Sequence, residues 1–454
     1  MNFLLTLLTS VASLWNISMN LDNSIDFIYD DYPVLNNSCA EYVYSERGTI
    51  VSLCNKDIYY NYTLGQPINK TSQQLGKYDE QNITFNSINK NLPSVTFVFQ
   101  FLEDNNNLLF YQNYHIPLYT NKISVIKNGK LGLAYPSKRL LKVPFDNDLQ
   151  SFYKSEKMNS LVKGTSAYVT SIYDSSENSN RGMTIGFIQH NLWKNGIEYN
   201  GDIIHAISGI NGILETRDIV PHGLVNTTNS PHLFMSINDD WRNGIEDYAI
   251  KMADFLPYSF PDREPITGWN SWAGIIDGEG RSDVNRFLNT VLLFNKLNVS
   301  SQNIEIGGDA LYNLSYPDSH KWMDKNHAFK QLSSVYTSPF IIYDEKYQYV
   351  NCSLKPCNKN EYNCYLFNDI ILKTYEGEPI IPLSFLSKNN TRILDVSHPI
   401  TPCILDHIAI KQKLSLYDSV KMDYINIVAY EGNHFNKQIA PTGMAAYSYG
   451  LDLI

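Results

Sequence analysis

The residues best suited to chemistry lie in the second half of the chain. Trp269 and Trp272 stand close together, and the acids that follow them are Asp309, Asp395 and Glu431. Aromatic rings can stack on the apolar C–H face of a sugar, while carboxylates can bind its hydroxyl groups. This combination predicts a carbohydrate-binding pocket. The alternative is that the two tryptophans only pack against neighbouring side chains.

Motifs for other chemistries are missing from the sequence. It has no His-Glu-x-x-His zinc motif, no Gly-x-Ser-x-Gly nucleophile elbow and no Gly-x-x-x-x-Gly-Lys-Ser/Thr phosphate loop. We therefore expect no metal and no cofactor. His434 near Glu431 suggests an acid–base pair, although a histidine on a surface loop is the more common case. The 36 Lys and Arg residues against 46 Asp and Glu give a net charge of −10, which argues against nucleic acid or an anionic membrane as partner.

The first half of the chain has the pattern of a β-sandwich. The 454 residues allow two or three domains, and short apolar or alternating runs dominate residues 20–260. Strands are predicted at 95–102, 123–126, 167–173 and 183–188, with turns at 105–107, 128–129 and 174–181. More than ten short strands at this spacing favour a sandwich over a barrel.

After residue 261 the pattern changes to strand followed by helix, which is typical of parallel βα units. The predicted strands are 267–272, 303–306, 339–343 and 424–428, and the predicted helices are 282–297 and 402–416. A cysteine-containing insertion near 344–391 interrupts this series. Four strands fall short of a complete (β/α)8 barrel, which takes about 250 residues.

Several features indicate export from the cell. Residues 1–19 resemble a secretory signal peptide, since an uncharged apolar run of about eleven residues is too short to span a bilayer. A short buried N-terminal helix is the alternative. Nine Asn-x-Ser/Thr sequons are candidate glycosylation sites: Asn36, Asn61, Asn69, Asn82, Asn226, Asn298, Asn313, Asn351 and Asn389.

The six cysteines also indicate an oxidising compartment. They are Cys39, Cys54, Cys352, Cys357, Cys364 and Cys403, an even number that predicts disulfides. A zinc site on Cys352, Cys357 and Cys364 is the alternative, but no histidine lies at a matching interval. We expect a soluble protein, secreted or at the cell surface, with no membrane span.

One motif resembles a known family. Gly268-Trp269-Asn270-Ser271-Trp272 is similar to the Gly-Trp-Asn-Ser-Trp signature of the α-galactosidase-like (melibiase-type) glycoside hydrolases. Residues 186–196 and 239–248 resemble the sandwich domain of fungal members, and residues 394–399 and 431–447 resemble segments beside the family's fourth barrel strand. The resemblance runs from about residue 180 to the C-terminus. It implies a β-sandwich over 20–260, followed over 261–454 by an incomplete TIM barrel of about four βα units.

The resemblance fails at the catalytic positions. Retaining glycosidases need two carboxyl groups about 5–5.5 Å apart. In the family the fourth strand ends in Lys-x-Asp, whose Asp is the nucleophile. Laid on the predicted strand 424–428, the Lys position holds Asn426 and the Asp position holds Val428. The paired acids of the second strand are replaced by Gly307 and Gly308, with Asp309 displaced by a residue, so the catalytic residues stay unassigned.

Three hypotheses follow. The first is a secreted α-galactosidase-like homologue that keeps sugar contacts but has lost catalysis, because Val428 holds the nucleophile position and the later barrel strands are absent. Its candidate substrate-binding residues are Trp269, Trp272, Asp309, Asp395, Asn426 and Glu431. The second is a functional retaining glycosidase that we have misaligned or that is truncated in this sequence. The third is a secreted carbohydrate- or protein-binding module. The edges of a half barrel would also predict self-association.

Overall fold

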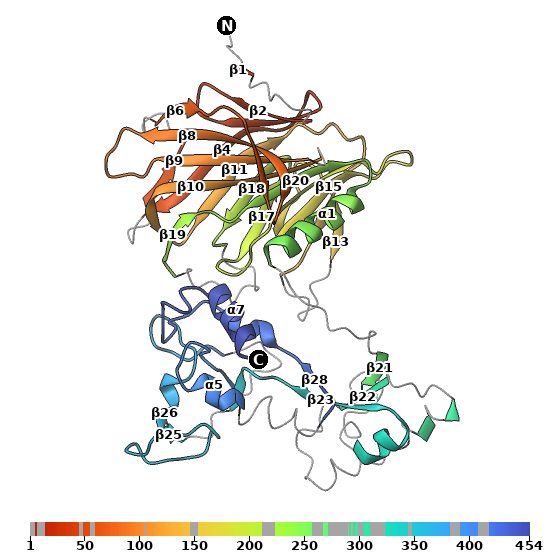
Figure 1. Ribbon diagram of the computed structural model, residues 1–454, viewed down its shortest axis with the longest axis vertical. Helices are drawn as coiled ribbons and strands as arrows, with labels where there is room; N and C mark the ends of the chain where they lie inside the picture. The colour runs from red at the N-terminus through yellow and green to blue at the C-terminus, as the bar shows by residue number, and fades with distance from the viewer. Residues whose placement is uncertain are drawn as a thin grey trace. The chain divides into compact units, whose positions relative to one another are not determined.

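The computed structural model describes residues 5–6, 14–44, 49–54, 60–103, 106–145, 153–210, 223–256, 267–270, 304–308, 323–343, 347–381, 391–406 and 417–454, with a few single residues between 289 and 297. The chain divides into two compact units. The first comprises residues 1–258 with 441–445, and the second comprises residues 259–440 with 446–454. Figure 1 shows that strands dominate the first unit.

The first unit is a β-sandwich of two antiparallel sheets (Figure 1). The first sheet has the order β1 (Leu5–Thr6), β2 (Trp15–Met19), β3 (Ile25–Tyr29), β4 (Tyr32–Tyr44), β11 (Ile123–Leu131), β18 (Ile203–Ser208), β17 (Asn195–Asn200) and β14 (Lys163–Ala167), and β5 (Thr49–Ser52) pairs with β4. The second has the order β13 (Lys154–Lys157), β12 (Lys138–Lys142), β15 (Val169–Asp174), β16 (Gly182–Phe187), β20 (Leu233–Asn238), β10 (Asn107–Thr120), β9 (Val95–Leu102), β8 (Gly76–Ser87) and β6 (Tyr60–Leu64). In this sheet β19 (Val225–Asn229) pairs with β10, and β7 (Ile68–Ser72) pairs with β8.

The core of the sandwich lies between the sheets. Alternate residues of β9 and β10 point inward, so the rings of Phe97, Phe99 and Phe110 stack at centroid distances of 5.6 to 6.2 Å. Trp15 of β2 is fully buried in the same core. Residues 15–19 lie inside the segment predicted as a signal peptide, so the strand would survive only a cleavage that falls before Trp15.

One helix covers the other face of the second sheet. α1 (Trp241–Phe255) packs on β16, β20 and β15, and Asp240 caps its first turn by accepting a hydrogen bond from the Arg242 N–H at 3.0 Å. Gly244 permits the close approach, since a Cβ there would lie 2.5 Å from Thr184 Oγ1. The Arg242 guanidinium also forms an ion pair with the Asp240 carboxylate.

The predicted strands of this unit are confirmed, with two corrections. Residues 95–102 form β9, and residues 175–181 connect β15 to β16. The predicted strand 167–173 spans two strands, because β14 ends at Ala167 and β15, in the other sheet, begins at Val169. Asn128 and Gly129, predicted as a turn, lie inside β11. Asn128 has φ of +56° and the register with β18 shifts between Ile126 and Gly129, which makes this a β-bulge.

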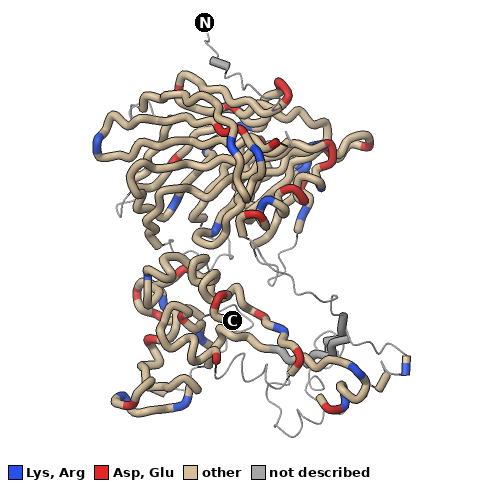
Figure 2. The backbone as a smooth tube through the Cα atoms, viewed as in Figure 1, with Lys and Arg blue, Asp and Glu red and all other residues tan. Residues whose placement is uncertain are grey.

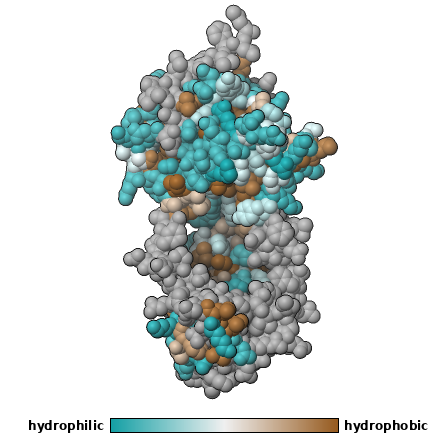
Figure 3. Space-filling view, turned by 90° about the vertical axis from the view of Figure 1, so that its right-hand side faces the viewer, coloured by the Kyte–Doolittle hydropathy of each residue, from teal (hydrophilic) through white to brown (hydrophobic). Residues whose placement is uncertain are grey.

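The surface of the sandwich is polar and carries charges of both signs. Figure 2 shows Lys and Arg interspersed with Asp and Glu over the first unit, with no basic stripe. Figure 3 shows this unit as mostly hydrophilic in that view, with scattered apolar residues. No helix in the described part of the chain is long and apolar enough to cross a membrane.

The second unit contains a parallel sheet. Its order is β21 (Thr267–Asn270), β22 (Ile304–Gly308), β23 (Leu332–Thr337) and β28 (Ser419–Met422), and all three pairings are parallel. The first two strands match the predicted ones. The third overlaps a strand of another sheet, and the fourth was predicted wrongly, because apolar runs alone do not separate strands from helical turns. Residues 341–343 form β24, which pairs antiparallel with β27 (Thr391–Ile393), and residues 425–429 form the 3-10 helix η6.

The remaining elements are short. They are β25 (Tyr349–Val350), β26 (Tyr365–Leu366), η4 (Phe367–Asp369), α5 (Thr401–Ile404) and α7 (Gly443–Leu453). The helix predicted at 402–416 begins as α5, and its residues after 406 lie outside the described ones, as does most of the helix predicted at 282–297. The predicted disulfides are confirmed: Cys39–Cys54, Cys352–Cys403 and Cys357–Cys364. The incomplete barrel stays a prediction.

Candidate functional site

The first candidate site is the carboxyl end of β28. Because β28 runs parallel to β23, with Thr337 opposite Met422, both strands end at the same edge of the sheet. Asp423 is the first residue beyond β28, and its N–H donates to the carbonyl of Thr337 at 2.9 Å. Side chains that follow parallel strands at this edge are the usual source of active-site groups in α/β proteins.

Lys421 and Asp423 form a half-exposed charged pair at this edge. Lys421 Nζ lies 3.5 Å from Asp423 Oδ2, and the side chains are 42% and 29% exposed. The N–H of Tyr424 donates to Asp423 Oδ1 at 2.9 Å. Tyr424 has φ of +53°, a left-handed conformation that is unfavourable for a bulky residue and that recurs at functional sites. The carboxylate is therefore oriented by its neighbours and still reachable from solvent.

This geometry corrects the predicted fourth strand. The fourth parallel strand is β28 and not residues 424–428, and the residues at its carboxyl end are Lys421, Met422 and Asp423. Val428 lies in η6 and is only 1% exposed, and Asn426 is half-buried in the same turn. Neither lies at the end of a strand of the parallel sheet.

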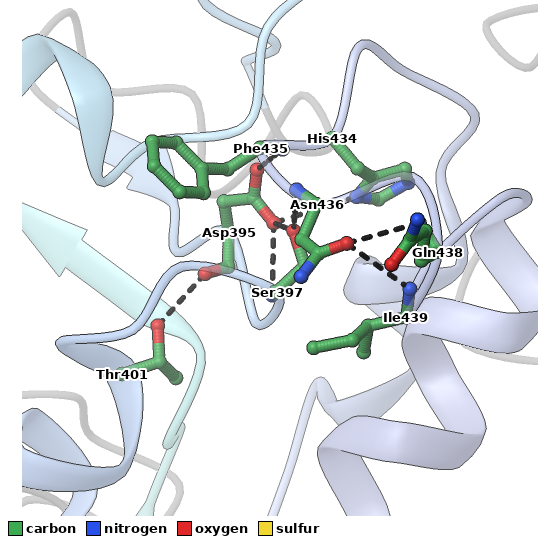
Figure 4. A network of polar contacts seen from close by, with 8 residues as sticks. All are labelled: Asp395, Ser397, Thr401, His434, Phe435, Asn436, Gln438 and Ile439. Carbon is green, nitrogen blue, oxygen red and sulfur yellow. Dashed lines mark hydrogen bonds and ion pairs between the residues drawn. The ribbon is translucent and has the colours of Figure 1, made fainter.

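The second candidate site surrounds Asp395 (Figure 4). Its Oδ1 accepts hydrogen bonds from the Ser397 N–H at 3.0 Å and the Ser397 hydroxyl at 2.7 Å, and its Oδ2 accepts one from the Phe435 N–H at 2.7 Å. His434 Nδ1 lies 3.5 Å from Oδ1. The Thr401 hydroxyl donates to the Asp395 carbonyl at 2.7 Å. These contacts tie the segment before α5 to the loop at 434–436.

The carboxylate of Asp395 is buried and charged. Burial by itself would raise its pKa, but His434, the Ser397 hydroxyl and the Phe435 N–H favour the anion more strongly, so the pKa lies below its ordinary value. Both Asp395 and His434 have side chains only 2% exposed. The prediction that His434 lies on a surface loop is therefore wrong, and the Asp395 carboxylate is held by Ser397, Phe435 and His434, as expected of a structural residue.

The other predicted site residues are placed unevenly. Trp269 lies on β21, paired with Ile306 of β22, while Trp272 and Asp309 lie outside the described residues. Glu431 is buried, 2% exposed, at the start of the loop that carries His434. Their use in sugar binding stays a prediction.

A cavity that the sequence did not indicate lies beside Asp395. It has a volume of about 600 Å³ and is lined by residues from 369–373, by Asp395 and by residues 433–438. The three segments are far apart in sequence, so only the fold brings them together. In the described part of the chain, no cluster of three or more His, Cys, Asp or Glu side chains could hold a metal.

Neither a family model nor a curated protein matches the sequence. Solved structures do match the fold. The galactosidase domain of an alpha-galactosidase-sucrose kinase is 11% identical with a TM-score of 0.52, over 96% of this chain and 61% of that one. A GH36 alpha-galactosidase from Geobacillus stearothermophilus in complex with raffinose is 10% identical with a TM-score of 0.53, over 99% of this chain and 69% of that one.

A third structure gives the same result. The alpha-N-acetylgalactosaminidase of Bifidobacterium bifidum, in its GalNAc complex, is 6% identical with a TM-score of 0.60, over 98% of this chain and 74% of that one. This chain thus spans about three fifths to three quarters of the length of these three proteins. The protein has the fold of the α-galactosidase-like glycoside hydrolases.

Proposed function

We propose that this protein is a retaining glycoside hydrolase of the α-galactosidase type, with Asp423 as its nucleophile. The observation that carries the proposal is Lys421-x-Asp423 at the carboxyl end of β28. This is the family's Lys-x-Asp pattern, on the fourth strand of a parallel sheet, in a chain with that family's fold. The solved neighbours include enzymes named for α-galactosides and for α-linked N-acetylgalactosamine, which supports an α-galactoside or a close analogue as substrate.

In this mechanism the Asp423 carboxylate attacks the anomeric carbon of the sugar. A bond forms between Asp423 and the sugar, the glycosidic bond breaks, and the leaving oxygen takes a proton from an acid that we do not assign. Water then attacks the ester and releases the sugar and the carboxylate. Lys421 orients the Asp423 carboxylate and balances its charge, and the Tyr424 N–H fixes its second oxygen.

An impaired homologue is the competing proposal. Two of the reasons to expect lost catalysis concern particular residues, and the part that rested on Val428 no longer applies because that residue lies in η6. The other part rests on the second parallel strand, where Gly307 and Gly308 stand in place of the family's paired acids. Those acids hold sugar hydroxyls in the family, so their loss would weaken substrate binding and would leave the nucleophile in place.

The test is to trap the covalent intermediate. A 2-fluoro-α-galactosyl fluoride has a leaving group that needs no acid, and its fluorine slows hydrolysis of the ester, so the nucleophile should become labelled. We expect a mass increase of one fluorosugar on the tryptic peptide that contains Asp423. Asp423→Asn should abolish the label, and Asp452→Asn, at an exposed acid in α7, is the matched control. A label on another acid, or none in folded protein, would contradict the assignment.

We also propose that the protein is secreted. Three disulfides form and persist in oxidising compartments, which supports export. The sequons at Asn61, Asn69 and Asn226 are exposed, whereas those at Asn36, Asn82 and Asn351 are half-buried. We therefore expect N-glycans first at the exposed three. Deglycosylation of protein from the medium of a eukaryotic host, followed by peptide mapping, tests this.

A further inference from the structure

The cavity beside Asp395 has the size of a small-molecule site. Its volume of about 600 Å³ lies within the range of about 300–1,000 Å³ that is usual for ligand pockets. All its lining residues belong to the second unit, and neither Lys421 nor Asp423 is among them. The cavity therefore offers a binding surface that the proposed catalytic pair does not form.

The formal charges of the lining cancel. Lys373 Nζ lies 3.5 Å from Asp369 Oδ1, and the Asp395 carboxylate accepts hydrogen bonds from Ser397 and Phe435, so three of the four charged side chains already have partners. The fourth, Lys437, places its ammonium 5.8 Å from the centroid of the Tyr375 ring. Two lysines and two aspartates make the cavity neutral overall, which favours an uncharged ligand over an anion.

The rest of the lining combines an aromatic ring with hydrogen-bonding groups. Phe435 is 56% exposed, and its ring also contacts the ring of His398, edge to face, at a centroid distance of 4.4 Å. Asn433 and Gln438 present exposed amides. His434 is 4% exposed, and its Nε2 has no hydrogen-bond partner among the described residues. A buried polar atom without a partner is costly unless a ligand or water satisfies it.

We propose that this cavity binds a neutral saccharide. The exposed Phe435 ring suits the apolar C–H face of a sugar, and the amides of Asn433 and Gln438 suit its hydroxyl groups. His434 Nε2 offers one more hydrogen bond from the wall of the cavity. The proposal concerns binding alone and does not rest on the nucleophile at Asp423.

The test measures binding of raffinose to the full-length Asp423→Asn chain by titration calorimetry, so that hydrolysis cannot consume the ligand. We expect saturable binding that includes one raffinose in the cavity, in addition to any bound beside residue 423. Phe435→Ala and Gln438→Ala, each added to this background, should each weaken it at least fivefold. Gln438 is exposed, so its truncation leaves no gap in the core. The Gln438 variant therefore still tests the cavity if the Phe435 variant misfolds. Tyr362→Ala removes an aromatic ring that is 94% exposed and lies outside the cavity, and it should change nothing.

Three outcomes would overturn the proposal. They are an absence of saturable binding, equal binding by the parent and both cavity variants, or at least fivefold tighter binding of galacturonate than of raffinose, which would make the ligand an anion. If the labelling experiment fails but raffinose binding depends on Phe435, the proposed nucleophile is wrong and the cavity remains a saccharide site. Labelling without such binding would do the reverse.

Discussion

Asp395 and Asp423 both follow a β-strand closely in the second unit, but their carboxylates have different surroundings. Asp395 is 2% exposed and accepts hydrogen bonds from two backbone N–H groups and a hydroxyl, while Asp423 is 29% exposed and has one N–H and one ammonium beside it. The first carboxylate has little left to offer a substrate, and the second keeps an accessible face. The family-like segments of the sequence include Asp395 and not Asp423, so it is the contacts of each carboxylate that identify the accessible one.

The largest difference is expected in catalysis. Asp423→Asn removes the negative oxygen that attacks the sugar and keeps the size of the side chain, so hydrolysis of aryl α-galactosides should fall roughly a thousandfold or more. Urea denaturation should change little, because Asp423 is half-exposed. Steady-state rates and unfolding curves of the same preparation check both expectations. Unchanged hydrolysis in Asp423→Asn would remove this residue from the mechanism.

Asp395 should show the opposite behaviour. Asp395→Ala leaves His434, the Ser397 hydroxyl and the Phe435 N–H buried without their acceptor, which should lower the free energy of unfolding by about 3–5 kcal/mol. Asp369→Ala is the control, because that acid is 49% exposed and its ion pair should contribute at most about 1 kcal/mol. Equal stability losses in the two variants would show that burial does not set the role of Asp395.

The difference between these two acids could not be seen in the sequence, although much of the sandwich could. Period-two alternation depends only on local residue order, so 95–102 and 183–188 were predicted as strands and lie in or overlap β9 and β16. The fourth parallel strand was missed because β28, Ser-Val-Lys-Met, is less apolar than Ile425-Asn426-Ile427-Val428 just after it. That richer run is apolar because η6 packs into the core, with Ile427 and Val428 each 1% exposed.

Features that depend on distant contacts were also missed. α1 was not predicted, because its sequence has no strong helical pattern of apolar residues. One of its contacts with the sheet is made through Gly244, which gives no apolar signal. The cavity joins residues 369–373 to 433–438, about sixty positions apart, and no spacing rule connects them. His434 was expected on the surface because loop histidines usually are, and only the tertiary structure places Asp395 beside it.

The two disulfides of the second unit should contribute unequally to its stability. Cys352–Cys403 joins cysteines 51 residues apart, whereas Cys357–Cys364 joins cysteines only 7 residues apart. The first disulfide also anchors α5, whose first residue, Thr401, is hydrogen-bonded to the Asp395 carbonyl. Loop entropy assigns about 4 kcal/mol to the first and about 2 kcal/mol to the second. Replacing each pair by serine and measuring urea unfolding should give losses in that order. The reverse order would show that native contacts, rather than loop length, decide the effect.

The smallest effect concerns pH. Because the pKa of Asp395 in the folded protein lies below its unfolded value, the charged carboxylate stabilises the fold fully above the unfolded pKa of about 4, and this contribution is lost as the pH falls further. Unfolding free energies of the wild type and of Asp395→Asn should therefore differ most near pH 6 and converge toward pH 3, since the variant has no proton to take up at this position. Parallel curves over that range would mean that Asp395 keeps an ordinary pKa, and that its burial stabilises the fold through hydrogen bonds that do not depend on its charge.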